Sequence, residues 1–141
     1  MRSRLRPLGL AVLLLVGACS GGDGGAGRVE VQGAGVARTW TQAELVAMPA
    51  GTVEYHGKQY TGVPLVALVP ALGLKVDAPL TATAADGYTQ TLAPEVLGRA
   101  DALLAYTVDG GPLPADAGPL RLVVPGAKGL SVKQVVRLGQ P

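Results

Sequence analysis

The sequence predicts one α+β domain in which short strands are interrupted by short helices. The clearest indication is the stretch from Leu103 to Leu138, where three apolar runs rich in branched residues are separated by Gly- and Pro-rich turns. Upstream, strand-like segments alternate irregularly with helix-start signals, which fits an α+β domain better than a regular doubly wound sheet. With 141 residues, 21 Gly and 11 Pro, the chain has room for one domain with many turns.

The three C-terminal runs are predicted strands over residues 103–108, 120–124 and 132–138. The first two are separated by a turn at 109–112, and the last two by a loop at 125–129. The middle run, LRLVV, is almost entirely apolar, which is typical of a strand covered on both faces. We therefore expect it to lie in the middle of the core.

The start of the domain predicts a hairpin followed by a capped helix. Residues 29–31 alternate like a strand, and residues 36–40 are expected to pair with them across a glycine-containing turn. Thr41 and Glu44 have the spacing of a capping box, in which each side chain bonds the backbone N–H of the other residue. The helix is expected to run to about Met48.

The next segment predicts a second hairpin, over residues 52–61, that turns at His56, Gly57 and Lys58. Residues 63–68 predict a helix with Pro64 at its first position, where a missing N–H costs nothing. Pro70 is expected to break or restart that helix before Gly73.

A third hairpin and one helical turn complete the middle of the chain. Residues 80–84 and 88–92 are expected to pair across the turn at 85–87. Residues 94–97 predict a helical turn that closes near Gly98.

The N-terminus predicts a lipoprotein export signal over residues 1–18. Basic residues precede an apolar run at 8–16, which is too short to span a bilayer comfortably. The sequence Val-Gly-Ala-Cys at 16–19 resembles a bacterial lipobox, which implies cleavage before Cys19 and lipid attachment to that residue. The alternative is an ordinary secretory signal with a leftover thiol. We expect a lipidated, glycine-rich tether at 19–28 and a domain at 29–141.

These features predict an extracytoplasmic protein anchored to a membrane by acyl chains. Three of the 12 basic residues precede the cleavage point and none of the 10 acidic residues does, so the mature part has 9 against 10, or net −1. The remaining Lys and Arg residues are scattered, so nucleic acid is not an expected partner. The membrane is the expected partner, together with an envelope redox or membrane protein.

Several ordered sequence blocks resemble one known family, the molybdopterin-binding oxidoreductase domain of the sulfite oxidase family. The resemblance covers the chain from about Thr39 to Leu138 and implies the family's mixed-sheet fold and molybdopterin as a cofactor. The blocks are LVAMP (45–49), YTGVPLVALV (60–69), ADGYTQTL (85–92), LLAY (103–106), DGGPLP (109–114), GPLRLVVPG (118–126) and SVKQVVRL (131–138).

The molybdenum ligand of that family is missing where the resemblance would place it. The family holds the metal through the pterin dithiolene and one protein cysteine. Here the matching interval is residues 54–60, which contains no cysteine, and the sole thiol is Cys19. A soft thiolate suits such a metal, and neither His56 nor a tyrosine replaces it. We therefore expect no metal ligand, no catalytic residue and no oxygen-atom transfer.

Two groups of polar residues remain as candidates for other chemistry. His56 is the only histidine, and it is either an exposed turn residue or a ligand contact. Four aspartates lie beside Gly, Ala or Pro in predicted turns, where their side chains are expected to organise the local backbone rather than act as acid and base. These are Asp86, Asp101, Asp109 and Asp116.

The loop at 125–129 is a candidate anion cradle, because backbone N–H groups next to cations suit a phosphate. The resemblance implies binding of the pterin and its phosphate here, with Lys133 matching the lysine of the family's SVKW block and Gln134 replacing its tryptophan. The alternative is a strand connection with solvated cations. The candidate residues are Arg121, Lys128, Gly129, Ser131 and Lys133.

Three functions remain open from the sequence. The first is a lipid-anchored ligand- or partner-binding module without molybdenum catalysis. The second is a molybdopterin-binding redox protein. The third is a structural lipoprotein that reuses the scaffold.

Overall fold

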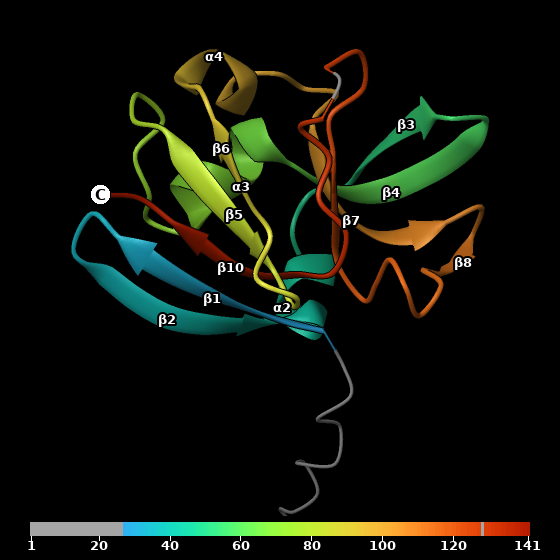
Figure 1. Ribbon diagram of the computed structural model, residues 1–141, viewed down its shortest axis with the longest axis horizontal. Coiled ribbons are helices and arrows are strands. Elements are labelled where there is room, and N and C mark those ends of the chain that lie inside the picture. Colours follow the sequence, from blue (N-terminus) through green and yellow to red (C-terminus); the bar gives the residue numbers. More distant parts are fainter. Residues whose placement is uncertain (1–26, 128) are drawn as a thin grey trace, which may run out of the picture.

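Two sheets meet at the centre of the molecule, and three short helices lie beside them (Figure 1). The computed structural model describes residues 27–127 and 129–141. The predicted export signal, Cys19 and Lys128 lie outside the described residues, and so does most of the predicted tether.

The first sheet has the strand order β2-β1-β10-β5-β6. β1 pairs in parallel with β10, which comes from the other end of the chain, and every other pair is antiparallel. The mixed sheet implied by the resemblance is therefore confirmed. The strands are β1 (Arg28–Gly33), β2 (Val36–Thr41), β5 (Leu80–Ala84), β6 (Thr89–Leu92) and β10 (Val135–Gly139).

The second sheet has the order β3-β4-β7-β8, and β9 also pairs with β7. Gly62 permits the close approach of β4 and β7, because a Cβ at this position would lie 2.2 Å from the carbonyl oxygen of Leu104. The strands are β3 (Gly51–Tyr55), β4 (Lys58–Pro64), β7 (Leu103–Val108), β8 (Gly111–Pro112) and β9 (Arg121–Val123).

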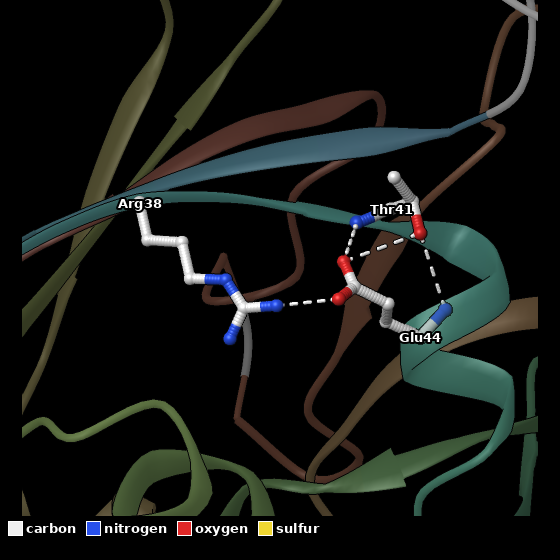
Figure 2. A network of polar contacts seen from close by, with 3 residues as sticks. All are labelled: Arg38, Thr41 and Glu44. Atoms are coloured by element: carbon white, nitrogen blue, oxygen red, sulfur yellow. Dashed lines mark hydrogen bonds and ion pairs between the residues drawn. The ribbon is translucent and has the colours of Figure 1, made fainter.

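The helices are α2 (Gln42–Val46), α3 (Leu65–Ala71) and α4 (Pro94–Leu97). The capping box predicted at α2 is confirmed: the N–H of Thr41 donates to Glu44 Oε1 at 3.0 Å, and the N–H of Glu44 donates to Thr41 Oγ1 at 3.2 Å. Arg38 from β2 forms an ion pair with the other oxygen of Glu44 (Figure 2). The helix start is thus tied to the sheet.

The predictions for both prolines near α3 were wrong. Pro64 is the last residue of β4 and the N-cap of α3, since its ψ of 138° is extended. Pro70 does not break the helix, because its carbonyl accepts the N–H of Gly73 while Val69 accepts the N–H of Leu74. Those two bonds form a Schellman end, which Gly73 permits through its φ of +82°.

The other predicted elements match the structure closely, with one exception. The strand predicted at 132–138 begins only at Val135, and Val132 makes a single bridge to Leu122. Between Val132 and Val135 the backbone leaves the extended conformation, since Gln134 has a φ of +53°.

Buried leucines and valines from both sheets and all three helices form the main core. A smaller cluster on the far face of the second sheet contains Tyr60, Ala105, Leu113 and Val123. Leu122 packs in the main core and its neighbour Val123 in the smaller cluster, so the predicted two-faced burial of residues 120–124 is confirmed. No helix in the described ranges has the length and apolar character needed to cross a bilayer.

Candidate functional site

Strand alternation brings several candidate side chains to one face of the second sheet. Tyr55 on β3 pairs with Lys58 on β4, and Tyr60 pairs with both Val53 and Val108. Because side chains two residues apart point the same way, Lys58 and Tyr60 share a face. This is the face of the smaller core cluster, and Tyr60 is buried there.

Arg121 projects from β9 onto the same face and is held between two tyrosines. Its Nη1 donates to Tyr60 Oη at 2.8 Å, and its guanidinium carbon lies 5.4 Å from the Tyr55 ring centroid and 5.3 Å from that of Tyr60. Its Nε is buried and has no hydrogen-bond acceptor among the described residues. A cation held by aromatic faces, with an unused donor, is suited to bind negative charge.

The segment after β9 is fixed in place by hydrogen bonds from both sides. Ser131 Oγ accepts from the N–H of Val124 at 3.1 Å. The N–H of Gln134 donates to the carbonyl of Ala117 at 2.8 Å, and the carbonyl of Gln134 accepts from Ala85 at 2.9 Å. Gln134 is thus bonded both to the turn between β5 and β6 of the first sheet and to the segment between β8 and β9 of the second.

Arg99 anchors the beginning of this loop. Its guanidinium donates to the carbonyl of Pro125 at 2.5 Å and makes two bonds of 2.9 Å to the carboxylate of Asp101. Hydrogen bonding to Arg99 lowers the pKa of Asp101, and the same contact raises the pKa of Arg99. Asp101 therefore orients a side chain that holds the loop.

A cavity of about 370 Å³, called here the main cavity, lies where the two sheets meet. Four of the five residues predicted to form an anion site line it, and Lys128 lies outside the described residues. The anion-binding role of the four stays a prediction. The lining residues are Tyr55, Ala84, Asp86, Tyr88, Asp116, Arg121, Gly129, Ser131, Lys133 and Gln134.

His56 lies at the tip of the hairpin between β3 and β4, beside a second cavity of about 350 Å³. Both His56 (φ +53°) and Gly57 (φ +77°) have left-handed backbone, as a type I′ turn requires. The predicted turn is confirmed, while contact of His56 with a ligand stays a prediction. Its ring centroid lies 4.1 Å from that of Tyr55, which joins this cavity to the main one.

A third hollow of about 150 Å³, called here the small hollow, shares Asp116, Arg121 and Lys133 with the main cavity. It contains Lys58, for which the sequence predicted only a place in a turn. The sequence did contain one signal for it: Lys58 and Tyr60 are two residues apart on a predicted strand, so their side chains share a face. The lining residues are Lys58, Tyr60, Val108, Pro114, Asp116, Ala117, Arg121 and Lys133.

The four aspartates do not gather into an acid and base pair. Asp86 accepts the N–H of Tyr88 within its own turn, as predicted. Asp109 instead accepts the N–H of Gln59 on the neighbouring strand, and Asp101 binds Arg99. Asp86 and Asp116 both line the main cavity, and Asp116 also lines the small hollow. Within residues 27–127 and 129–141, no three His, Cys, Asp or Glu side chains cluster as metal ligands would.

The comparisons with known proteins agree with this architecture. The family described as oxidoreductase molybdopterin binding domain matches residues 27–139. The crystal structure of the sulfane dehydrogenase SoxCD from Paracoccus pantotrophus is similar, with a TM-score of 0.69 and 26% identity over 80% of this chain. The match covers only 37% of that chain. No curated protein sequence matches significantly. The sequence resemblance and the predicted fold are thereby confirmed.

Proposed function

We propose that this chain, which belongs to the oxidoreductase molybdopterin binding domain family, is a ligand-binding module that holds an organic anion in its main cavity. The observation that carries the proposal is Arg121, a cation fixed between two tyrosines with a buried Nε–H that has no acceptor among the described residues. A buried donor without a partner costs about 1–3 kcal/mol, so a site that leaves one free gains by binding an acceptor.

The main cavity suits a planar organic group that carries a negative substituent. Its volume falls within the roughly 300–1,000 Å³ that is usual for small-molecule sites. Tyr55 and Tyr88 line it with aromatic surface, while Arg121 and Lys133 supply positive charge. Ser131 adds a hydroxyl whose oxygen already accepts from Val124, which leaves its proton free to be donated.

The residues present fit the organic part of molybdopterin but not the usual protein ligand of its metal. Arg121, Ser131 and Lys133 would hold the phosphate, and the tyrosines would lie against the ring system. When bound in this family, the group supplies oxygen-atom and electron transfer at molybdenum. Among the residues that the structure describes, none that lines the main cavity is a cysteine, and the only cysteine of the sequence, Cys19, lies outside them. Oxygen-atom transfer that depends on a cysteine ligand is therefore not part of the proposal.

A second candidate function is a molybdopterin-binding redox protein of the sulfite oxidase family. It is supported by the family match over residues 27–139 and by the 26% identity to a sulfane dehydrogenase chain. In this case the pterin would still be bound, and an envelope redox or membrane protein would exchange electrons with it. A structural lipoprotein without a ligand is the third candidate.

The proposed setting is the outer side of a bacterial membrane, where the lipobox at residues 16–19 would attach acyl chains to Cys19. The glycine-rich residues that follow would space the domain from the lipid surface. A module held at a membrane encounters other envelope proteins at a high effective concentration, which favours a membrane or redox partner.

The deciding experiment is analysis of the full-length protein purified from a host that makes molybdopterin. Molybdenum and the fluorescence of the oxidised pterin would be measured for wild type, for Lys133→Ala and for Lys75→Ala, an exposed lysine outside the cavities. Pterin near one equivalent that falls only in Lys133→Ala supports the redox candidate.

Protein without pterin that binds other organic anions through Lys133 supports the ligand-binding module alone. Protein that binds neither contradicts both candidates and leaves the structural lipoprotein. Equal loss in the Lys75 variant would show that net charge, and not the cavity, governs binding.

A further inference from the structure

We propose that the end of the first sheet from which the proposed tether leaves is a docking surface for the lipid headgroups of the membrane. Gly27 is buried at this end, where its carbonyl accepts the N–H of Gln42 at 2.7 Å and its N–H donates to Gln42 Oε1 at 3.3 Å. The start of the domain is therefore fixed beside the start of α2. The inference rests on the proposed function and its membrane setting, in which Cys19 carries the lipid.

The pairing of the first sheet places the beginnings of β1, β10 and β6 and the ends of β2 and β5 at this end. Arg28 pairs with Thr41, β10 runs parallel to β1, and Val135 at the beginning of β10 pairs with Ala84 at the end of β5. In Figure 1 the start of β1, α2 and the turn between β5 and β6 lie close together. The opposite end, near Gln140, is about 20 Å away for strands of six residues.

Apolar side chains are exposed at this same end. Within the described ranges five large hydrophobic residues are exposed, and three of them lie here: Val46 (49%), Tyr88 (50%) and Val136 (38%). Val46 is the last residue of α2, Tyr88 precedes β6, and Val136 follows the first residue of β10. A tyrosine with an apolar ring and a polar tip is typical of the headgroup level of a membrane.

The length of the proposed tether determines which end of the domain faces the lipid. Gly27 is eight residues after Cys19. Even a fully extended chain of that length reaches only about 29 Å. A domain of this size is about 35 Å across. The tether is therefore too short to pass around the domain, so the end that holds Gly27 stays nearest to the membrane.

Apolar contact, and not charge, is expected to hold the surface on the lipid. The exposed cations Arg28 and Lys133 lie near the exposed carboxylates of Asp86 and Asp116, so the charges at this end offset one another. Contacts by three half-exposed side chains correspond to a dissociation constant in roughly the mM range. A short tether supplies an effective concentration of about the same size. The docked and undocked populations are therefore comparable.

Docking in this orientation brings the main cavity to the lipid surface. Ala84, Tyr88 and Gln134 line the cavity at this end of the sheet, and the carbonyl of Gln134 is held by the N–H of Ala85 at 2.9 Å. The organic anion of the proposed function would then be met at the headgroup level of the membrane.

The test uses the exported, lipidated protein reconstituted into phosphatidylcholine vesicles that contain a lipid with a spin-labelled headgroup as quencher. The thioether at Cys19 does not react with a thiol-specific fluorescent label, so Val46→Cys and Val136→Cys each carry a single label. Each label is expected to lose roughly half of its fluorescence to the quencher, because the docked and undocked populations are comparable.

Val76→Cys is the matched control. Val76 is 54% exposed and lies at the opposite end of the sheet, since the N–H of the neighbouring Lys75 donates to Gln140 Oε1 at 2.8 Å. Its label should keep nearly all of its fluorescence. Val46→Glu should reduce the quenching of a label at position 136, because a charge resists entry into the lipid, whereas Val76→Glu should leave that quenching unchanged.

Equal quenching at positions 46, 76 and 136 would overturn the docking surface, because the tethered domain would then have no preferred orientation. So would the absence of quenching at positions 46 and 136, with folding verified by urea denaturation. Labelling of the wild type would reveal a free thiol at Cys19 and would remove the tether together with this inference. Retention of an organic anion is measured in detergent without vesicles, so the proposed function can hold or fail independently of these results.

Discussion

The side chain of Arg121 contributes to the lining of two cavities. It lines both the main cavity and the small hollow, and the rings of Tyr55 and Tyr60 restrict its guanidinium. A lysine at this position would keep the charge but lose the planar group that lies against two aromatic faces. The geometry of the site therefore depends on an arginine and not merely on a positive charge.

Ser131 has a structural role beside its place in the main cavity. We predict that Ser131→Ala lowers the free energy of unfolding by about 1–2 kcal/mol, because the N–H of Val124 loses its acceptor in a partly buried position. Urea denaturation measures the change. Ser131→Thr keeps a hydroxyl and should lose less. Equal stability of wild type and the alanine variant would show that water replaces the hydroxyl without cost.

At the scale of single elements, α2 is a five-residue helix that depends on its first turn. The backbone N–H of Thr41 is the largest influence that lowers the pKa of Glu44, and Arg38 lowers it further. Figure 2 shows these three residues joined at the point where β2 meets the helix. Because the ring of Trp40 packs against Arg38, with 3.7 Å between the guanidinium carbon of Arg38 and the ring centroid, the network also covers part of the edge of the core.

The lowered pKa of Glu44 predicts a specific dependence of stability on pH. A carboxyl whose pKa is lower in the folded state stabilises the protein above its unfolded pKa, and this contribution disappears as the pH falls through the lowered pKa of the folded state. We expect Glu44→Gln to be less stable than wild type at neutral pH, with the difference shrinking in acid.

Urea denaturation of both proteins at pH 7 and at about pH 3 measures this effect. Glu54→Gln, which changes an exposed strand carboxylate outside the network, is the matched control. A stability difference for Glu44→Gln that stays constant between the two pH values would contradict the assigned role of the capping box.

Helices and turns whose signals lie within a few residues could be predicted from the sequence, whereas the pairing of strands far apart in the chain could not. The capping box at Thr41 and the turn at His56 depend on residues a few positions apart, so the pattern contained the information. The pairing of β1 with β10 joins residues such as Glu30 and Arg137, which are 107 positions apart. Pro70 was misjudged because proline lacks only the N–H: its carbonyl still accepts from Gly73, and the helix continues past it to Ala71.

The candidate site shows the same division. Arg121, Ser131 and Lys133 are neighbours in the sequence, so their grouping could be expected. Lys58 joins them only because β3, β4 and β7 form one sheet whose face carries the smaller core cluster. Strand alternation predicts which side chains share a face, but it does not predict which face borders a hollow.

At the scale of the whole molecule, the site depends on both sheets at once. The main cavity takes Tyr55 from the second sheet, Ala84 from the first, and the loop that leads from β9 to β10. In Figure 1 this loop, in orange to red, passes between the two sheets. Since β10 pairs with β1 at the N-terminal end of the domain, the loop that carries Lys133 is held by the strand next to the proposed tether.

Membrane attachment through Cys19 is the last prediction, and it concerns how the whole molecule is held. We expect wild-type protein from bacteria fed a labelled fatty acid to carry the label, and Cys19→Ser to carry none, because an oxygen cannot replace the sulfur in the thioether. Each buried methylene contributes about 0.8 kcal/mol, so two or more acyl chains hold the protein stably without a membrane-spanning helix.

Ser20→Ala is the matched control, since it changes the neighbouring residue and keeps the sulfur. Label, and not membrane fractionation, is the decisive measurement, because an uncleaved precursor also remains at the membrane through its apolar run at residues 8–16. Unlabelled wild-type protein whose mature chain begins after an ordinary cleavage would establish the secretory alternative. In that case the domain would diffuse freely to its partner, and the high local concentration assumed for an envelope partner would no longer apply.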